Sequence, residues 1–128
     1  MKTTIFICGP YRGGTIFETK KNIDIAWEYS LAAWEKWNCV ITPHLNSQFM
    51  DGCFPDEKFL GAYLQLIREY PNIDIGLLPN YFRSSGSIAE IGLALDLSLN
   101  FYLAYEGFRL YDGVYVEDNI RQEGGLHS

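Results

Sequence analysis

The sequence predicts an α/β fold, a three-layer, doubly wound parallel sheet of the flavodoxin-like or Rossmann-like kind. Two observations predict it. Short apolar strands alternate with amphipathic helices from residue 3 to residue 104, and the loops rich in glycine, serine and arginine each follow a strand. The chain has 128 residues, of which 48% are hydrophobic, enough for one core. We therefore expect a single domain over residues 1–128.

The first half of the chain predicts two strands and two helices. Residues 3–8 and 39–42 are short apolar strands. Thr15 and Glu18 have capping-box spacing, which places a helix start at Thr15, and a helical apolar period continues to about Trp37. The apolar face of this helix consists of Ile16, Ile23, Ala26, Trp27, Ala33, Trp34 and Trp37. Residues 43–55 are expected to form a long loop before a helix over 56–69, which turns Phe59, Leu60, Tyr63, Leu64 and Ile67 inward.

The second half predicts a strand at 73–78, a helix at 86–97 and a strand at 100–104. Tyr111-Asp112-Gly113-Val114 carries a hairpin signal, and the last residues are expected to fray. Parallel strands end at one edge of their sheet. We therefore expect three loops to converge there, at residues 9–14, 43–54 and 79–87.

Composition excludes several classes of function. A net charge of −6 disfavours a nucleic-acid polymer as partner. No apolar run approaches the roughly 20 residues of a membrane span, and no signal peptide is recognisable. The three cysteines favour reduced thiols and a cytoplasmic protein. No paired metal-ligand motif is present, so we expect neither a metal nor another cofactor.

The segment Ser84-Ser85-Gly86-Ser87-Ile88-Ala89-Glu90 is the most informative in the chain. It leads from a strand into a helix, and Gly86 removes a side chain where a sugar would approach. Glu90 can attack an anomeric carbon and form a covalent glycosyl intermediate. Ser87 and Glu90 also have capping-box spacing, so Glu90 can instead close its own helix start. The residues alone leave both interpretations open.

The other two loops offer binding groups. Gly9, Arg12 and Gly13 precede a helix, where backbone N–H groups and a guanidinium can hold an anion. The alternative is a tight turn with a surface arginine. His44 can donate to a base or sugar, or serve as a structural hydrogen-bond partner beside Pro43.

Taken together, these motifs resemble the nucleoside 2-deoxyribosyltransferase superfamily over about residues 4–104. The resemblance rests on Ile7-Cys8-Gly9-Pro10-Tyr11-Arg12-Gly13-Gly14, on Pro43-His44-Leu45-Asn46, and on the segment from Ser84 to Glu90 followed by Gly92 and Ala94. It implies a flavodoxin-like, usually oligomeric enzyme that cleaves the N-glycosidic bond of a nucleoside or nucleotide. Ser84 makes the chain similar to the 2'-deoxynucleoside 5'-phosphate N-hydrolase branch.

The resemblance assigns roles to residues. Glu90 matches the nucleophile, Ser84 lies where that branch meets the 5'-phosphate, and Gly9, Arg12 and Gly13 match its phosphate and sugar loop. Tyr11 offers a ring for stacking on the base. The substrate contacts expected are therefore Gly9, Tyr11, Arg12, Gly13, His44, Asn46, Ser84 and Gly86.

The chain departs from the family pattern at two positions. Phe6 stands where a first-strand tyrosine is frequent, and Tyr63 stands where an aspartate helps to protonate or position the base. Asp51, Asp56 or Tyr63 can supply the general acid instead, or activity is lost. Besides Glu90, the catalytic candidates are thus Tyr63 and Asp51.

These observations lead to one main hypothesis, an N-glycosidase or deoxyribosyltransferase-like enzyme acting on a nucleoside or its 5'-monophosphate. A nucleotide-derivative binding protein without turnover is the alternative, and a flavin carrier is a third possibility that the first loop disfavours. We also expect a homodimer or higher homo-oligomer, because the aromatic tail from Tyr102 to Tyr115 is too apolar for a free end.

Overall fold

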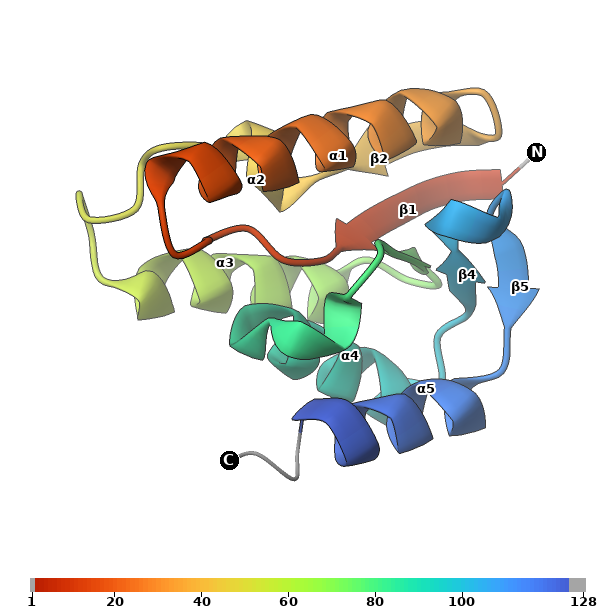
Figure 1. The fold of residues 1–128 in the computed structure, drawn as a ribbon. Helices are drawn as coiled ribbons and strands as arrows, with labels where there is room; N and C mark the ends of the chain where they lie inside the picture. Colours follow the sequence, from red (N-terminus) through yellow and green to blue (C-terminus); the bar gives the residue numbers. More distant parts are fainter. Residues whose placement is uncertain (1, 125–128) are drawn as a thin grey trace.

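The sheet has five strands in the order β2-β1-β3-β4-β5 (Figure 1). The computed structural model describes residues 2–124. Its strands are β1 (Lys2–Cys8), β2 (Trp37–Ile41), β3 (Asp74–Leu77), β4 (Phe101–Leu103) and β5 (Arg109–Tyr111). The first four strands are parallel, and β5 pairs antiparallel with β4. The predicted three-layer, flavodoxin-like α/β fold is confirmed.

Helices cover both faces of the sheet. In Figure 1, α1 (Ile16–Trp34) lies above the sheet, and α3 (Asp56–Glu69), α4 (Ser85–Asp96) and α5 (Gly113–Asn119) lie below it. The shorter elements are α2 (Pro43–Asn46), the 3-10 turns η1 (Tyr81–Arg83) and η2 (Ala104–Glu106), and the π-helical turn η3 (Ile120–Gly124). No helix among residues 2–124 is both long and apolar enough to span a bilayer.

The core is divided by the sheet into two apolar clusters. Alternation along β1 assigns its side chains to opposite faces, with Ile5 and Ile7 toward α1, and Phe6 and Cys8 toward α3 and α4. All four side chains are buried. β1 is thus an interior strand, paired with β2 on one side and β3 on the other and covered on both faces, and the first site loop follows it.

The first helix is shorter than predicted and buries a narrower face. It ends at Trp34, and Trp37 is instead the first residue of β2, where its Nε1–H donates to Asp74 at 2.8 Å. On α1, Ile23, Ala26 and Ala33 are buried, whereas Trp27 is 54% exposed. The expected inward positions of Ile16 and Trp34 are also wrong, since both are exposed. The buried stripe consists mainly of small residues that let the helix approach the sheet closely, and the bulky side chains fall on its flank.

Two further predictions are corrected by cap chemistry. Residues 43–55 do not form a continuous loop, because Pro43 opens the short helix α2, a position that suits its fixed φ. The hairpin predicted at 111–114 is also wrong. Asp112 caps α5 by accepting a hydrogen bond from the Val114 N–H at 2.8 Å, and the antiparallel strand β5 precedes it. The fraying predicted for the last residues concerns 125–128, which lie outside the described residues.

The strand order places a topological switch point between β1 and β3. The chain leaves β1 through α1 to reach β2 on one side, then returns through α3 to β3 on the other side of β1. In such sheets the loops after the two strands separate and leave a crevice. Here those loops are residues 9–14, which we call the first loop, and residues 78–84, which lead into α4.

Candidate active-site cleft

A cleft of about 520 Å³ lies at the carboxyl ends of the strands, beside the switch point. Its walls come from the first loop, from α2 and the segment after it, from α3, and from the start of α4. The predicted convergence of three loops is therefore confirmed. Of the predicted site residues, the cleft is lined by Gly9, Tyr11, Arg12, His44, Asp51, Tyr63, Ser84, Gly86 and Glu90. Gly13 and Asn46 do not line it.

Several lining residues lie in the predicted loops but were not among the predicted site residues. Ser47, Arg83 and Ser87 face the cleft with the predicted residues. Arg83 and Ser87 adjoin Ser84 and Gly86 in sequence, so their place in the segment between β3 and the first turn of α4 is a signal that identifies them. Ser47 follows α2, a helix that was not predicted, and no motif pointed to it.

Glu90 belongs to the second turn of α4 and does not cap the helix. The cap is Ser84, whose Oγ accepts a hydrogen bond from the Ser87 N–H at 3.2 Å, and the helix begins at Ser85. Ser87 is thus the third helical residue rather than the N-cap that a box with Glu90 requires. The capping interpretation of Glu90 is wrong. The carboxylate instead lines the cleft, and the residue is only 7% exposed.

Burial governs the protonation of Glu90. Desolvation raises the pKa of its carboxyl group to about 8, and a hydrogen bond from the Cys8 thiol opposes the rise. Cys8 itself is fully buried at the end of β1, and burial beside Glu90 raises the pKa of its thiol well above the usual value. A carboxylate with a pKa raised by burial in a cleft is a functional-site candidate, and it becomes nucleophilic once its proton is lost.

The glycines around the cleft serve different purposes. A Cβ on Gly9 would lie 2.5 Å from Leu78 Cβ, and a Cβ on Gly13 would lie 2.3 Å from Glu18 Cβ. Both glycines therefore make room for the chain itself. A Cβ on Gly86 would meet only Ser84 Oγ, at 4.0 Å. Gly86 consequently leaves open space at the start of α4, where a ligand can approach the backbone.

Two backbone donors of the first loop, those of Gly13 and Gly14, are already used inside the chain. The Gly13 N–H donates to Thr19 Oγ1 at 2.9 Å, and the Gly14 N–H donates to Glu18 Oε2 at 2.7 Å. A carboxylate of the chain thus occupies the anion position before α1, which satisfies both the helix dipole and the loop. Thr15 caps α1 as predicted, accepting from the Glu18 N–H.

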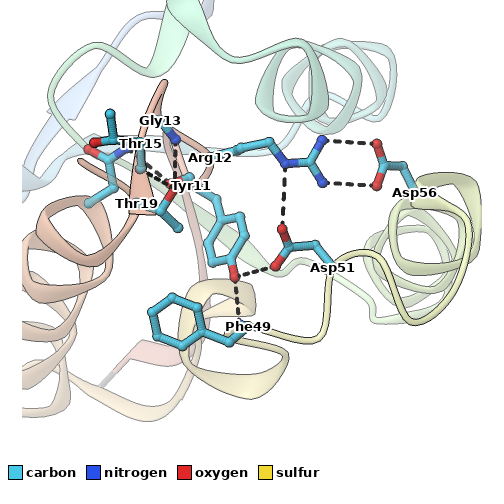
Figure 2. Close-up of polar contacts among 9 residues, drawn as sticks. Tyr11, Arg12, Gly13, Thr15, Thr19, Phe49, Asp51 and Asp56 are labelled. Atoms are coloured by element: carbon cyan, nitrogen blue, oxygen red, sulfur yellow. Dashed lines mark hydrogen bonds and ion pairs between the residues drawn. The ribbon is translucent and has the colours of Figure 1, made fainter. Parts of the chain in front are cut away.

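Arg12 is held between two carboxylates in Figure 2. Its terminal nitrogens donate to Asp56 at 3.1 and 3.3 Å, and its Nε lies 3.6 Å from Asp51 Oδ2. The ion pair raises the pKa of Arg12 and lowers that of the Asp56 carboxyl. These contacts link the first loop to the segment before α3 across the cleft.

Tyr11 reinforces the same link (Figure 2). Its hydroxyl donates to Asp51 at 2.8 Å and accepts the Phe49 N–H at 2.6 Å. Phe49 has a φ of 58°, a left-handed conformation that is unfavourable for a large side chain. The hydrogen bond from its N–H to Tyr11 helps to hold this backbone. We call residues 47–55 the mouth loop.

The side chains of His44 and Tyr63 both form hydrogen bonds to other residues of the chain. His44 is 4% exposed and its Nε2–H donates to the Pro10 carbonyl at 2.9 Å, while Nδ1 has no partner among the described residues. Burial lowers the pKa of His44, so its ring is neutral. The Tyr63 hydroxyl bonds Ser47 Oγ at 2.9 Å and accepts from Asn46 Nδ2 at 3.0 Å. It fastens α2 to α3.

The fold and cleft define a flavodoxin-like α/β protein with a buried carboxylate at its switch point. Residues 3–101 match a family described as a domain of unknown function, DUF7768, and the chain belongs to this family. The match ends within β4, so β5 and α5 lie beyond it. No curated protein matches the chain. Among residues 2–124, His, Cys, Asp and Glu side chains do not gather in a group of three that can hold a metal ion.

Proposed function

We propose that the cleft cleaves the N-glycosidic bond of a nucleoside or nucleoside 5'-monophosphate, with Glu90 as the nucleophile. The observation that carries the proposal is the position of Glu90. It is nearly buried, it lines the cleft, and it does not cap its helix. Burial of a carboxylate is unfavourable, and capping of the helix does not account for it here, so a role in the cleft is the interpretation that we favour.

The proposed reaction has two steps. In the first, an ionised Glu90 oxygen bonds to the anomeric carbon while the bond from that carbon to the base nitrogen breaks, and the base leaves with the electron pair. The base takes a proton from an acid in the cleft or from water. In the second step, water attacks the same carbon, the bond from that carbon to the Glu90 oxygen breaks, and the water loses a proton to solvent. This regenerates the carboxylate and gives the free sugar or its 5'-phosphate. A second base in place of water gives transfer instead.

The start of α4 is suited to hold the substrate beside Glu90. Gly86 leaves open space there, and the N–H groups of Ser85 and Gly86 lie in the first turn, where the helix dipole favours an acceptor. Tyr11 lines the same cleft, and its ring offers a surface for base stacking.

A binding protein without turnover is the second candidate, and one observation favours it. Tyr63 and Asp51, the two catalytic candidates besides Glu90, already have partners within the chain. The Tyr63 hydroxyl bonds Ser47 and Asn46, and Asp51 accepts from Tyr11 and lies beside Arg12. If neither group is released when substrate binds, the base has no protein acid to protonate it.

One experiment separates the two candidates. Base release is measured from the four common deoxynucleosides, the four ribonucleosides and their 5'-monophosphates, for the parent and for Glu90→Gln. Glu28→Gln on the exposed side of α1 is the matched control. We expect release by the parent and the control but not by Glu90→Gln. Equal release by all three would remove Glu90 from the chemistry. Binding by calorimetry without any release would establish the second candidate.

Self-association belongs to the proposal as well. In the tail, Phe108 and Val116 pack into the protein's own core, whereas Leu110, Val114 and Tyr115 are more than half exposed. Apolar side chains on this scale are typical of a surface that another chain covers. We expect a homo-oligomer, and sedimentation as a monomer would contradict this part.

A further inference from the structure

We propose that Asp51 and Asp56 are specificity-determining residues that keep a phosphate group out of the first-loop side of the cleft, so that an uncharged nucleoside is the preferred substrate. This inference rests on the proposed function and deepens it. The sequence left the choice between a nucleoside and its 5'-monophosphate open, with Ser84 as the expected phosphate contact at the start of α4 and Gly9, Arg12 and Gly13 as those of the first loop.

The first step of the argument concerns Arg12. A guanidinium binds phosphate well when its donors are free to form a paired fork. Here both terminal nitrogens donate to Asp56, and Nε faces Asp51 (Figure 2). The group of one cation and two carboxylates has a net charge of −1. Arg12 therefore acts as a counter-ion for two carboxylates at the exposed edge of the cleft, and a phosphate that reached it would also meet two negative charges.

The second step concerns the backbone. A phosphate loop needs N–H groups that point to an empty position. The N–H groups of Gly13 and Gly14 instead donate to Thr19 and Glu18, and the space beside Gly13 is filled by Glu18. Gly13 and Gly14 thus let a carboxylate of the chain approach. They do not form a cradle for the phosphate of a substrate.

The third step concerns the charges that line the cleft as a whole. Its lining contains the carboxylates of Asp51, Asp56 and Glu90 and the guanidinium groups of Arg12 and Arg83. When Glu90 is ionised for attack, carboxylates exceed cations. An incoming phosphate dianion is repelled, whereas the hydroxyl groups of a sugar can donate to the same carboxylate oxygens.

The test compares each deoxynucleoside with its own 5'-monophosphate. The ratio of base release, nucleoside over monophosphate, is measured for the parent, Asp51→Asn, Asp56→Asn and the double variant. Asp24→Asn is the matched control, because Asp24 pairs with Lys20 on α1 and does not line the cleft. The ratio of binding constants from calorimetry is measured on the same pairs, so a protein without turnover still gives an answer.

We expect the parent to prefer the nucleoside at least tenfold. Each single variant should lower the ratio by roughly three- to tenfold, the double variant by more, and the control by less than twofold. The effects should shrink as salt is added. A parent that prefers the monophosphate, or a ratio unchanged in the variants, overturns the inference while leaving the proposed cleavage standing. A preference of the parent for the monophosphate would favour a phosphate site at the start of α4. Failure to bind any nucleoside or monophosphate overturns both proposals.

Discussion

The Ser87 hydroxyl donates a hydrogen bond to the Gly9 carbonyl at 2.9 Å, and both groups are buried. The bond joins residues that are 78 positions apart in the chain. Gly9 directly follows β1, and Ser87 lies in the first turn of the helix that carries Glu90. This contact therefore fixes the helix that carries the carboxylate relative to β1, an interior strand of the sheet.

Removal of that hydroxyl should destabilise the protein. We expect Ser87→Ala to lower the free energy of unfolding by about 1–2 kcal/mol, because the buried Gly9 carbonyl loses its donor. Denaturant unfolding measures the difference. Ser85→Ala is the matched control, since Ser85 is exposed two residues earlier on α4, and it should change stability by less than about 0.5 kcal/mol. Equal losses for the two variants would contradict the structural role of Ser87.

The raised pKa of Glu90 predicts a stability that falls as pH rises. Below about pH 4.5 the carboxyl group is protonated in both states, and above it the unfolded chain ionises first. The folded form is disfavoured increasingly until pH passes about 8. We expect Glu90→Gln to remove this dependence and to stabilise the protein at pH 7.5 by on the order of 2 kcal/mol more than at pH 5.5. Thermal unfolding at both pH values checks it, and Glu28→Gln should show no such trend.

The same pKa predicts how base release depends on pH. Only ionised Glu90 can attack, and its pKa is about 8 in the ligand-free protein. We therefore expect kcat/KM to rise about tenfold per pH unit between pH 6 and pH 7.5, and to level off above pH 8. A rate that is flat from pH 5.5 to 9 would show that another step or another group limits the reaction.

Gly86 offers a test of the cleft that does not rely on charge. An added Cβ meets open space in the folded protein, and alanine favours a helix over glycine by about 0.5–1 kcal/mol. Gly86→Ala should therefore be at least as stable as the parent but release base at least tenfold more slowly, because the methyl group occupies the substrate's approach. Gly92→Ala is the control on the same helix. It also meets open space but lies outside the lining, and it should gain stability with unchanged base release.

The Tyr11 hydroxyl should control the order of the mouth loop. Tyr11→Phe removes the acceptor for the Phe49 N–H and the donor to Asp51. The left-handed backbone at Phe49 then loses its support, so we expect its amide to exchange with solvent at least tenfold faster, with global stability reduced by about 1–2 kcal/mol. Hydrogen exchange read at Phe49 decides the matter. Tyr105→Phe, at a tyrosine outside the cleft lining, should leave that amide unchanged.

The fold was predictable because local and global signals agree along most of the chain. Strand 3–8 and helix 56–69 match the structure within a residue, since apolar runs and helical periods were uninterrupted there. The end of α1 was not predictable from the period. Trp37 continues the helical spacing of apolar residues, but it is buried in β2 with its indole N–H on Asp74, and this long-range contact decides its conformation.

The sequence allowed us to predict which residues line the candidate site, but not the hydrogen bonds and ion pairs between them. Loop position after a strand was enough to bring Glu90, Ser84 and Arg12 to one cleft. The two carboxylates around Arg12 come from a segment about 40 residues away, and no local pattern indicates which anion a surface arginine will select. Likewise, the spacing of Ser87 and Glu90 indicates a helix start at Ser87, whereas the helix begins one turn earlier and is capped by Ser84.

Gly9 and Gly13 differ from Gly86 in what surrounds them, and this difference decides which glycines in a sequence of this family indicate the fold and which indicate the site. Gly9 and Gly13 make room for Leu78 and Glu18, so any chain that folds in this way has reason to keep them, active or not. Gly86 faces open space, and the fold would accept a larger residue there. A search pattern built on Gly9 and Gly13 therefore finds chains that share the fold. A search pattern that requires both Gly86 and Glu90 instead finds chains whose cleft a substrate can enter.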